Sequence, residues 1–65
     1  MKISINGVAK DVTSTNLTAV LHEAGDGDAH VATAVNGHFV PVGQRASCSI
    51  EAGDQLEIVA PRQGG

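Results

Sequence analysis

The sequence predicts a small α+β domain in which one mixed sheet of four to five strands wraps around one helix. Three observations lead to this prediction. The chain has 65 residues, which leaves room for one core. Two Asn-Gly dipeptides each follow a short strand-like run, and one segment carries apolar residues at helical spacing. We expect the folded domain at residues 1–59 and a C-terminal tail at residues 60–65.

The first predicted element is a β-hairpin. Residues 2–6 alternate, with Ile3 and Ile5 on one face, and Asn6-Gly7 supplies the positive φ angles of a type I′ turn. The chain should therefore return as a strand over residues 8–12. Lys10 interrupts the apolar face of that strand, so we expect it at the edge of the sheet.

A single helix should follow. Residues 13–16 offer several side-chain oxygens that can cap a helix start, and Gly25 can end the helix in a left-handed conformation. One apolar stripe runs between them, formed by Leu17, Val20, Leu21 and Ala24. A helix of roughly nine or ten residues is too short to be stable alone, so its stripe should pack on the sheet.

Three further strands complete the prediction. Residues 31–35 are apolar on both faces, as in the middle of a sheet, and Asn36-Gly37 then turns the chain. Phe39 and Val40 form a short strand that Pro41 should confine to an edge, because proline cannot donate to the ladder. Residues 42–49 have no clear period.

The last strand is expected at residues 55–59, after a turn at Gly53-Asp54. A hairpin, a helix, two strands and a final strand, in this order, correspond to the β-grasp or ubiquitin-like fold. The predicted core consists of Ile3, Ile5, Val8, Val12, Leu17, Val20, Leu21, Val31, Val35, Phe39, Leu56 and Ile58. An exposed apolar patch on the sheet, including Val40, Val42 or Val59, is the expected docking surface for partner proteins.

Composition argues against several classes of protein. The net charge is −3, the four Lys and Arg residues are scattered and Phe39 is the one aromatic residue, which disfavours nucleic-acid binding. The most apolar window, residues 31–35, is far shorter than the roughly 20 residues of a membrane span. Lys2 begins an alternating strand rather than a secretory signal, and Cys48 has no disulfide partner, so we expect a cytoplasmic protein.

The side chains that resemble catalytic or metal sites give weak signals. His22, His30 and His38 lack the close spacing of metal ligands. Asp26-Gly27-Asp28 begins like a calcium loop, but Val31 stands where that loop needs glycine and Gly37 where it needs glutamate. Cys48 has no base beside it and only Arg45 as a nearby cation, so a passive thiol is the better reading. We therefore expect no catalytic residue, no metal and no bound cofactor.

The end of the chain carries the stronger signal. Pro61 discourages further strand pairing, and Gly64 and Gly65 have no side chains. Six extended residues reach about 20 Å, so the Gly65 carboxylate could be presented to a partner. The alternative is an ordinary frayed terminus. Arg62 is either a solvated charge or a contact for an acidic groove on a partner, and Gln63 lies between it and the glycines.

A glycine pair lets a narrow tunnel close around the backbone and bring a catalyst to the last carbonyl. A carboxylate is a poor electrophile and must first be activated, usually as an acyl-adenylate formed from ATP. The chain has no phosphate-cradling loop, so ATP and Mg²⁺ should be bound by the partner enzyme. The small domain would then be a substrate rather than an enzyme.

The whole chain resembles the sulfur carrier family of thiamine biosynthesis, the ThiS family. The resemblance lies in Val35-Asn36-Gly37, Phe39-Val40-Pro41, Gly53-Asp54, Glu57-Ile58-Val59, Pro61 and Gln63-Gly64-Gly65. Two positions differ from many members, which have Arg in place of Val42 and Trp in place of Arg45.

The resemblance implies that several partner enzymes act on the chain one after another. An E1-like adenylating enzyme of the ThiF type would adenylate Gly65, and sulfur from a cysteine desulfurase or another donor would convert it to a thiocarboxylate. Thiazole synthase of the ThiG type would consume that sulfur. Pro61, Arg62, Gln63 and Gly64 would guide the tail. The alternatives are a sulfur carrier of the molybdopterin type or another pathway, a ubiquitin-like modifier, and a β-grasp interaction module with an inert tail.

Overall fold

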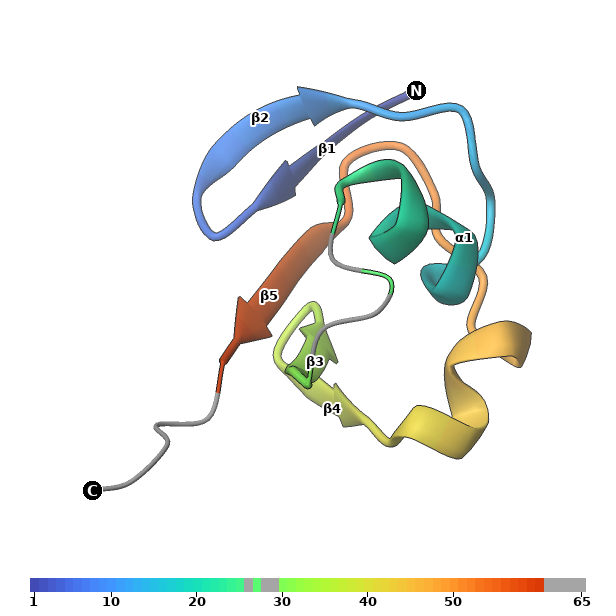
Figure 1. Cartoon of the computed structure of the whole chain (residues 1–65). Coiled ribbons are helices and arrows are strands. Elements are labelled where there is room, and N and C mark those ends of the chain that lie inside the picture. Colours follow the sequence, from blue (N-terminus) through green and yellow to red (C-terminus); the bar gives the residue numbers. More distant parts are fainter. Residues whose placement is uncertain (26, 28–29, 61–65) are drawn as a thin grey trace.

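The computed structural model describes residues 1–25, 27 and 30–60, which form five strands, one α-helix and one 3₁₀ helix (Figure 1). The strands are β1 (Lys2–Ile5), β2 (Val8–Asp11), β3 (Ala32–Val35), β4 (His38–Val40) and β5 (Gln55–Val59). The α-helix α1 spans Leu17–Glu23, and the 3₁₀ helix η1 spans Val42–Ser47. The predicted order of elements is confirmed.

All five strands belong to one mixed sheet in the order β2-β1-β5-β3-β4. β5 lies in the middle, parallel to β1 and antiparallel to β3, while β2 and β4 are the edges. In Figure 1 helix α1 lies within the curve of the sheet, with β1 and β2 on one side of it and β3 and β4 on the other. This arrangement is the predicted β-grasp fold.

Both Asn-Gly turns form as predicted. Asn6 and Asn36 each have a φ of 51°, and Gly7 and Gly37 each have a φ of 83°. Positive φ at both central positions gives the turn a twist that matches the strands of a hairpin. Lys10 lies on the edge strand β2, also as predicted.

Helix α1 begins where a single side chain caps it. Oδ1 of Asn16 accepts a hydrogen bond from the Ala19 N–H at 2.9 Å. The helix has seven residues, fewer than predicted, because the chain leaves it at Ala24 and Gly25 takes a φ of 91°. Leu17, Val20 and Leu21 are buried, but Ala24 is exposed, so its place in the predicted stripe is wrong.

The core differs from the prediction at the ends of the strands. Val40 is buried and Phe39 is 68% exposed, the reverse of what we expected. Register explains the exchange: Val40 lies opposite the buried Thr33, whereas Phe39 lies opposite Ala34 on the other face. Val8, another predicted core residue, is 56% exposed because it lies on the edge strand β2, which has a neighbour on one side only.

Ile50 is a buried core residue that periodicity missed. It follows an isolated bridge between Asn16 and Ser49, and its N–H donates to the Thr15 carbonyl at 2.8 Å. The segment before β5 is thus fastened to the start of α1. Four other predicted core residues are only half-buried. Three of them, Ile5, Val35 and Ile58, pack against the core, and the fourth is Val31.

Residues 42–49, which have no clear period, contain η1. Arg45 on η1 donates from Nε to the Thr33 hydroxyl at 3.1 Å and from Nη2 to the Val31 carbonyl. The Thr33 hydroxyl in turn donates to the Val40 carbonyl at 2.9 Å. Arg45 therefore braces η1 against β3, a local structural role.

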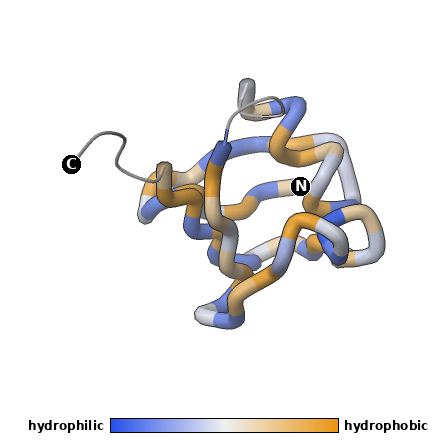
Figure 2. The backbone as a smooth tube through the Cα atoms, turned by 60° about the horizontal axis from the view of Figure 1, so that its bottom comes forward, coloured by the Kyte–Doolittle hydropathy of each residue, from blue (hydrophilic) through white to orange (hydrophobic). Residues whose placement is uncertain are grey.

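Polar and apolar residues are distributed as a single small core requires. In Figure 2 the strongly hydrophobic stretches lie mainly along the strands and the helix, and the tips of turns are hydrophilic or neutral. Among the described residues, no helix has the length and apolar character to cross a membrane.

Candidate functional site

The predicted site residues Pro61, Arg62, Gln63, Gly64 and Gly65 lie outside the described residues. Their predicted roles stay predictions. The structure does describe Ala60 and the strand that leads to it, β5. The geometry around the end of β5 is therefore what determines where residues 61–65 begin.

Two asparagines hold β5 at its opposite ends. At its start, the Gln55 N–H donates to Oδ1 of Asn36 at 2.9 Å, and Nδ2 of Asn36 donates to a carboxylate oxygen of Asp54 at 3.1 Å. At its end, the Ile58 N–H donates to Oδ1 of Asn6 at 2.9 Å, and Nδ2 of Asn6 donates to the Ile58 carbonyl at 3.1 Å. We call these the Asn36 clamp and the Asn6 clamp.

Each clamp comes from an Asn-Gly turn, so one sequence feature has two uses. The Asn backbone adopts the positive φ that the turn needs, while its amide side chain bonds to β5. The backbone N–H groups of both asparagines also bind β5, Asn6 to the Leu56 carbonyl at 2.9 Å and Asn36 to the Gln55 carbonyl at 2.8 Å. The clamps extend the sheet beyond the ends of the neighbouring strands.

The face of the sheet turned away from α1 carries an apolar surface beside the end of β5. Strand register places Phe39 opposite Ala34 and Val59 opposite Ala32, all on this face. We call these four residues the outer apolar surface. Phe39 is 68% exposed and Val59 is 61% exposed, so large apolar side chains face solvent here. Glu57 lies opposite Ala34 on the same face and is exposed as well.

The prediction of an exposed patch on the sheet is confirmed in part. Val59 is exposed on the sheet, as expected, whereas Val42 is exposed but lies on η1. Val40 is buried on the face of the sheet toward α1, and Phe39 takes its place on the outer face. A shallow hollow lies next to Val59, lined also by His30, Val31 and Ala32. The last residue of β5 is thus bordered by mainly apolar groups.

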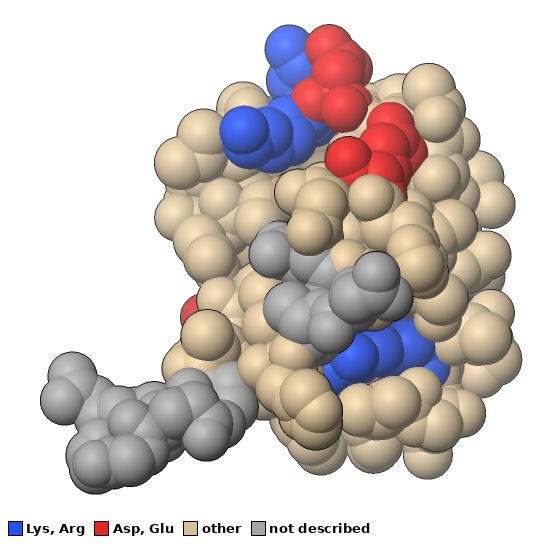
Figure 3. All heavy atoms as spheres, in the orientation of Figure 1, with Lys and Arg blue, Asp and Glu red and all other residues tan. Residues whose placement is uncertain are grey.

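Charged groups are concentrated elsewhere. Figure 3 shows acidic and basic atoms close together near the β1–β2 hairpin and a separate basic group in the lower right of this face, with mostly uncharged surface between them. Lys2 and Asp11 on these strands approach within 4.0 Å, and both are well exposed. An exposed pair of this kind contributes little to stability.

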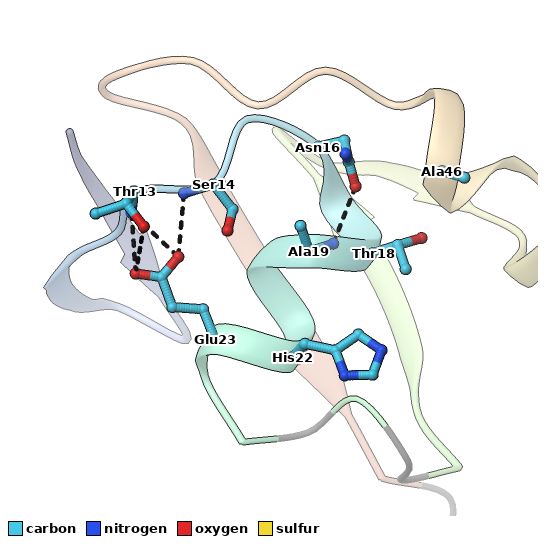
Figure 4. Close-up of a pocket in the computed structure, with 8 residues that line it drawn as sticks. All are labelled: Thr13, Ser14, Asn16, Thr18, Ala19, His22, Glu23 and Ala46. Carbon is cyan, nitrogen blue, oxygen red and sulfur yellow. Dashed lines mark hydrogen bonds between the residues drawn. The ribbon is translucent and has the colours of Figure 1, made fainter.

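A second polar cluster lies beside α1 (Figure 4). Glu23 accepts hydrogen bonds from the N–H groups of Thr13, at 2.9 and 3.1 Å, and of Ser14, at 3.1 Å. These bonds, the Thr13 N–H first, hold the pKa of Glu23 below its ordinary value of 4.5. Figure 4 shows the His22 ring pointing away from this cluster.

Glu23 and Asn16, two polar side chains of this cluster, are used by the chain itself. Glu23 fastens the linker between β2 and α1, and Asn16 caps the helix. Their roles are structural.

The remaining candidates do not assemble into a site within the described part of the chain. Cys48 is half-buried and packs against the core, consistent with a passive thiol. Among residues 1–25, 27 and 30–60, no three His, Cys, Asp or Glu side chains lie close enough to hold a metal ion.

Sequence reasoning missed the roles of two residues near the end of β5, Asn6 and Phe39. Asn6 was assigned a turn, and its side chain had no predicted partner because the contact spans 52 positions. The sequence places Phe39 in a short strand and predicts it in the core, but the structure exposes it. The available signal was alternation: adjacent strand residues point to opposite faces, so Phe39 and Val40 cannot both face the core.

Comparisons with known proteins agree with this fold. The sequence model of the ThiS family matches residues 3–65. The crystal structure of thiamine biosynthesis protein ThiS from Geobacter metallireducens is similar with a TM-score of 0.86 and 23% identity, over 100% of both chains. The NMR solution structure of a thiamine biosynthesis protein from Geobacter metallireducens is similar with a TM-score of 0.78 and 22% identity, over 100% of this chain and 88% of that one. No curated protein matches the chain.

Proposed function

Because the chain belongs to the ThiS family, we propose that it is a sulfur carrier of thiamine biosynthesis whose reactive group is the carboxylate of Gly65. The observation that carries this proposal is the family match, which extends through both terminal glycines to residue 65. The proposal takes Gly65 as the last residue of the working protein.

The chemistry has two steps, both on the terminal acyl group. An oxygen of the Gly65 carboxylate attacks the α-phosphorus of ATP, pyrophosphate leaves, and an acyl-adenylate forms. A sulfur nucleophile then attacks the acyl carbon and AMP leaves. When the sulfur arrives as a persulfide, a second thiol must cleave the S–S bond, which leaves the thiocarboxylate and a disulfide.

Absence of side chains at positions 64 and 65 supports this assignment, because an enzyme must close around the backbone to reach the last carbonyl. The catalytic groups, ATP and Mg²⁺ belong to an E1-like adenylating enzyme of the ThiF type. A cysteine desulfurase or another donor supplies sulfur, and a thiazole synthase of the ThiG type receives it. The carrier is returned as the carboxylate.

We further propose that the adenylating enzyme docks on the outer apolar surface. Val59 lies two residues before Pro61, so an enzyme that covers this surface is within reach of a tail that extends about 20 Å. Glu57 lies among these apolar groups and would be desolvated on docking. We therefore expect an apolar enzyme surface with a Lys or Arg opposite Glu57.

The test is mass spectrometry of the chain after incubation with ATP, Mg²⁺, the adenylating enzyme and a sulfur donor. We expect one oxygen to be replaced by sulfur in the fragment that contains Gly64 and Gly65. Fragment masses are essential because oxidation of Met1 or Cys48 gives nearly the same mass change. A chain that gains no sulfur in this fragment under conditions that load a known carrier would contradict the proposal.

The pathway needs a separate test. Rescue of a thiamine-requiring strain, without rescue of a strain deficient in molybdenum cofactor, is the expected outcome. The reverse pattern would identify a carrier of the molybdopterin type. Covalent attachment of Gly65 to lysines of other proteins would identify a modifier.

A further inference from the structure

The end of β5 is held on its β1 side by a side chain rather than by a strand. The last backbone pair between β1 and β5 joins Ile5 and Leu56, and β1 then turns away at Asn6. Ile58 has its N–H and its carbonyl on this side, beyond the reach of the β1 backbone. The Asn6 amide supplies one acceptor and one donor, at 2.9 and 3.1 Å, and so imitates one more strand residue.

On its other side β5 pairs with β3 as far as Val59, which lies opposite Ala32. The Asn6 clamp therefore holds Ile58 on the β1 side, two residues before Ala60, while pairing with β3 holds the end of β5 on its other side. Hydrogen bonds on both sides of a strand fix the orientation of its end, whereas a strand end that is bonded on one side only can twist and fray. The direction of β5 relative to the outer apolar surface depends on this contact.

We propose that Asn6 is a positioning residue for the sulfur-carrier reaction: its amide fixes the direction in which β5 delivers residues 60–65 toward the docked adenylating enzyme. The inference rests on the proposed function. Asn6 touches neither ATP nor the Gly65 acyl group. It acts through Ile58 and the end of β5.

Asn6→Gly is the informative substitution, because glycine accepts the φ of 51° and keeps the turn while both clamp hydrogen bonds disappear. Asn36→Gly is the matched control. It has the same φ, the same turn position and the same number of side-chain hydrogen bonds, but it holds the start of β5. Asn6→Asp keeps the acceptor for the Ile58 N–H and loses the donor to its carbonyl.

The size of the fall in adenylation rate distinguishes a lost orientation of β5 from a mere lengthening of the tether. Freeing two residues lengthens a six-residue tether to eight, which lowers the local concentration of its end by about 1.5-fold. Loss of direction adds to this, and we expect a loss of about three- to tenfold in kcat for adenylation. The KM should change less than about twofold, because the substitution leaves the outer apolar surface intact.

The experiment compares the four full-length chains with the adenylating enzyme, ATP and Mg²⁺, measuring pyrophosphate release, thermal unfolding and amide hydrogen exchange. We expect similar falls in Tm for Asn6→Gly and Asn36→Gly. We also expect slower adenylation and faster exchange at the Ile58 amide for Asn6→Gly alone. Asn6→Asp should lie between Asn6→Gly and the unsubstituted chain.

Equal adenylation rates for Asn6→Gly and Asn36→Gly would overturn the inference, as would a loss for Asn6→Gly of less than about twofold, because tether length alone explains that much. A rise in KM with unchanged kcat would also overturn it, since the substitution would then have altered docking. An unsubstituted chain that is never adenylated would overturn the proposed function and this inference together.

Discussion

Replacement of Phe39 by alanine should weaken the complex with the adenylating enzyme and leave the fold intact. The Phe39 side chain is 68% exposed on the edge strand β4, so the free protein gains little from it. An aromatic side chain has about 150–250 Å² of surface, of which roughly 140 Å² is then available for a partner to cover. At about 25 cal/mol per Å², full coverage corresponds to about 3.5 kcal/mol.

Alanine keeps part of that contact, so we expect a loss of about 2 kcal/mol, or a Kd about 30-fold higher. Calorimetric titration of the chain into the adenylating enzyme, without ATP, measures this directly. Val8→Ala is the matched control, because Val8 is 56% exposed and pairs with Ile5 on the face of the sheet toward α1. Its Kd should stay within about twofold of the unsubstituted chain.

The same two variants can contradict the reasoning. If Phe39→Ala and Val8→Ala change the Kd equally little, the outer apolar surface is not the docking surface. If Phe39→Ala lowers the Tm strongly, Phe39 supports the fold and its exposure has been misjudged. Either result would move the search for the docking surface to the other exposed apolar residue near this edge, Val42.

Three further predictions concern stability. Leu21 is 3% exposed, so Leu21→Ala should cost about 2–5 kcal/mol, most of the stability of a domain this small, and a thermal melt that barely moves would contradict the core assignment. The pKa of Glu23 is lowered in the folded protein, so Glu23 contributes stability that is present above pH 4.5 and is lost as the pH falls through the lower native pKa. The Tm of Glu23→Gln should therefore depend less on pH in this acidic range than the Tm of the unsubstituted chain. Equal pH dependence of the two Tm values would refute the role of the Thr13 contact. Gly53→Ala should cost about 1–2 kcal/mol in urea unfolding because φ is +88° and no atom obstructs a Cβ, and a neutral result would show that the turn relaxes.

Local signals were sufficient for the architecture. The Asn-Gly turns, the helical stripe and the strand-like runs predict the order of the five strands and the α-helix, because each depends on interactions within a few positions of the chain. The 3₁₀ helix η1 has no such local signal. Side-chain burial at the edges depends on register, which is set by pairing between distant strands. This is why Phe39 and Val40 were exchanged and why Val8 was placed in the core.

The candidate site divides in the same way. Gly64 and Gly65 stand out in the sequence because of the chemistry they permit, and that prediction needs no fold. The contacts at the end of β5 could be found only from the fold. The Asn6 clamp joins residues 52 positions apart, and the outer apolar surface draws on three strands. No periodicity within one segment reports contacts of that range.

The most direct test of the sulfur-carrier account is transfer of sulfur to thiazole synthase by chains that differ only at the last acyl group. The unsubstituted chain, loaded with the adenylating enzyme, ATP and a sulfur donor, should support thiazole formation. A chain amidated at Gly65, or extended by one alanine, should give none above background. Thiazole formation at the normal rate by either altered chain would contradict the account.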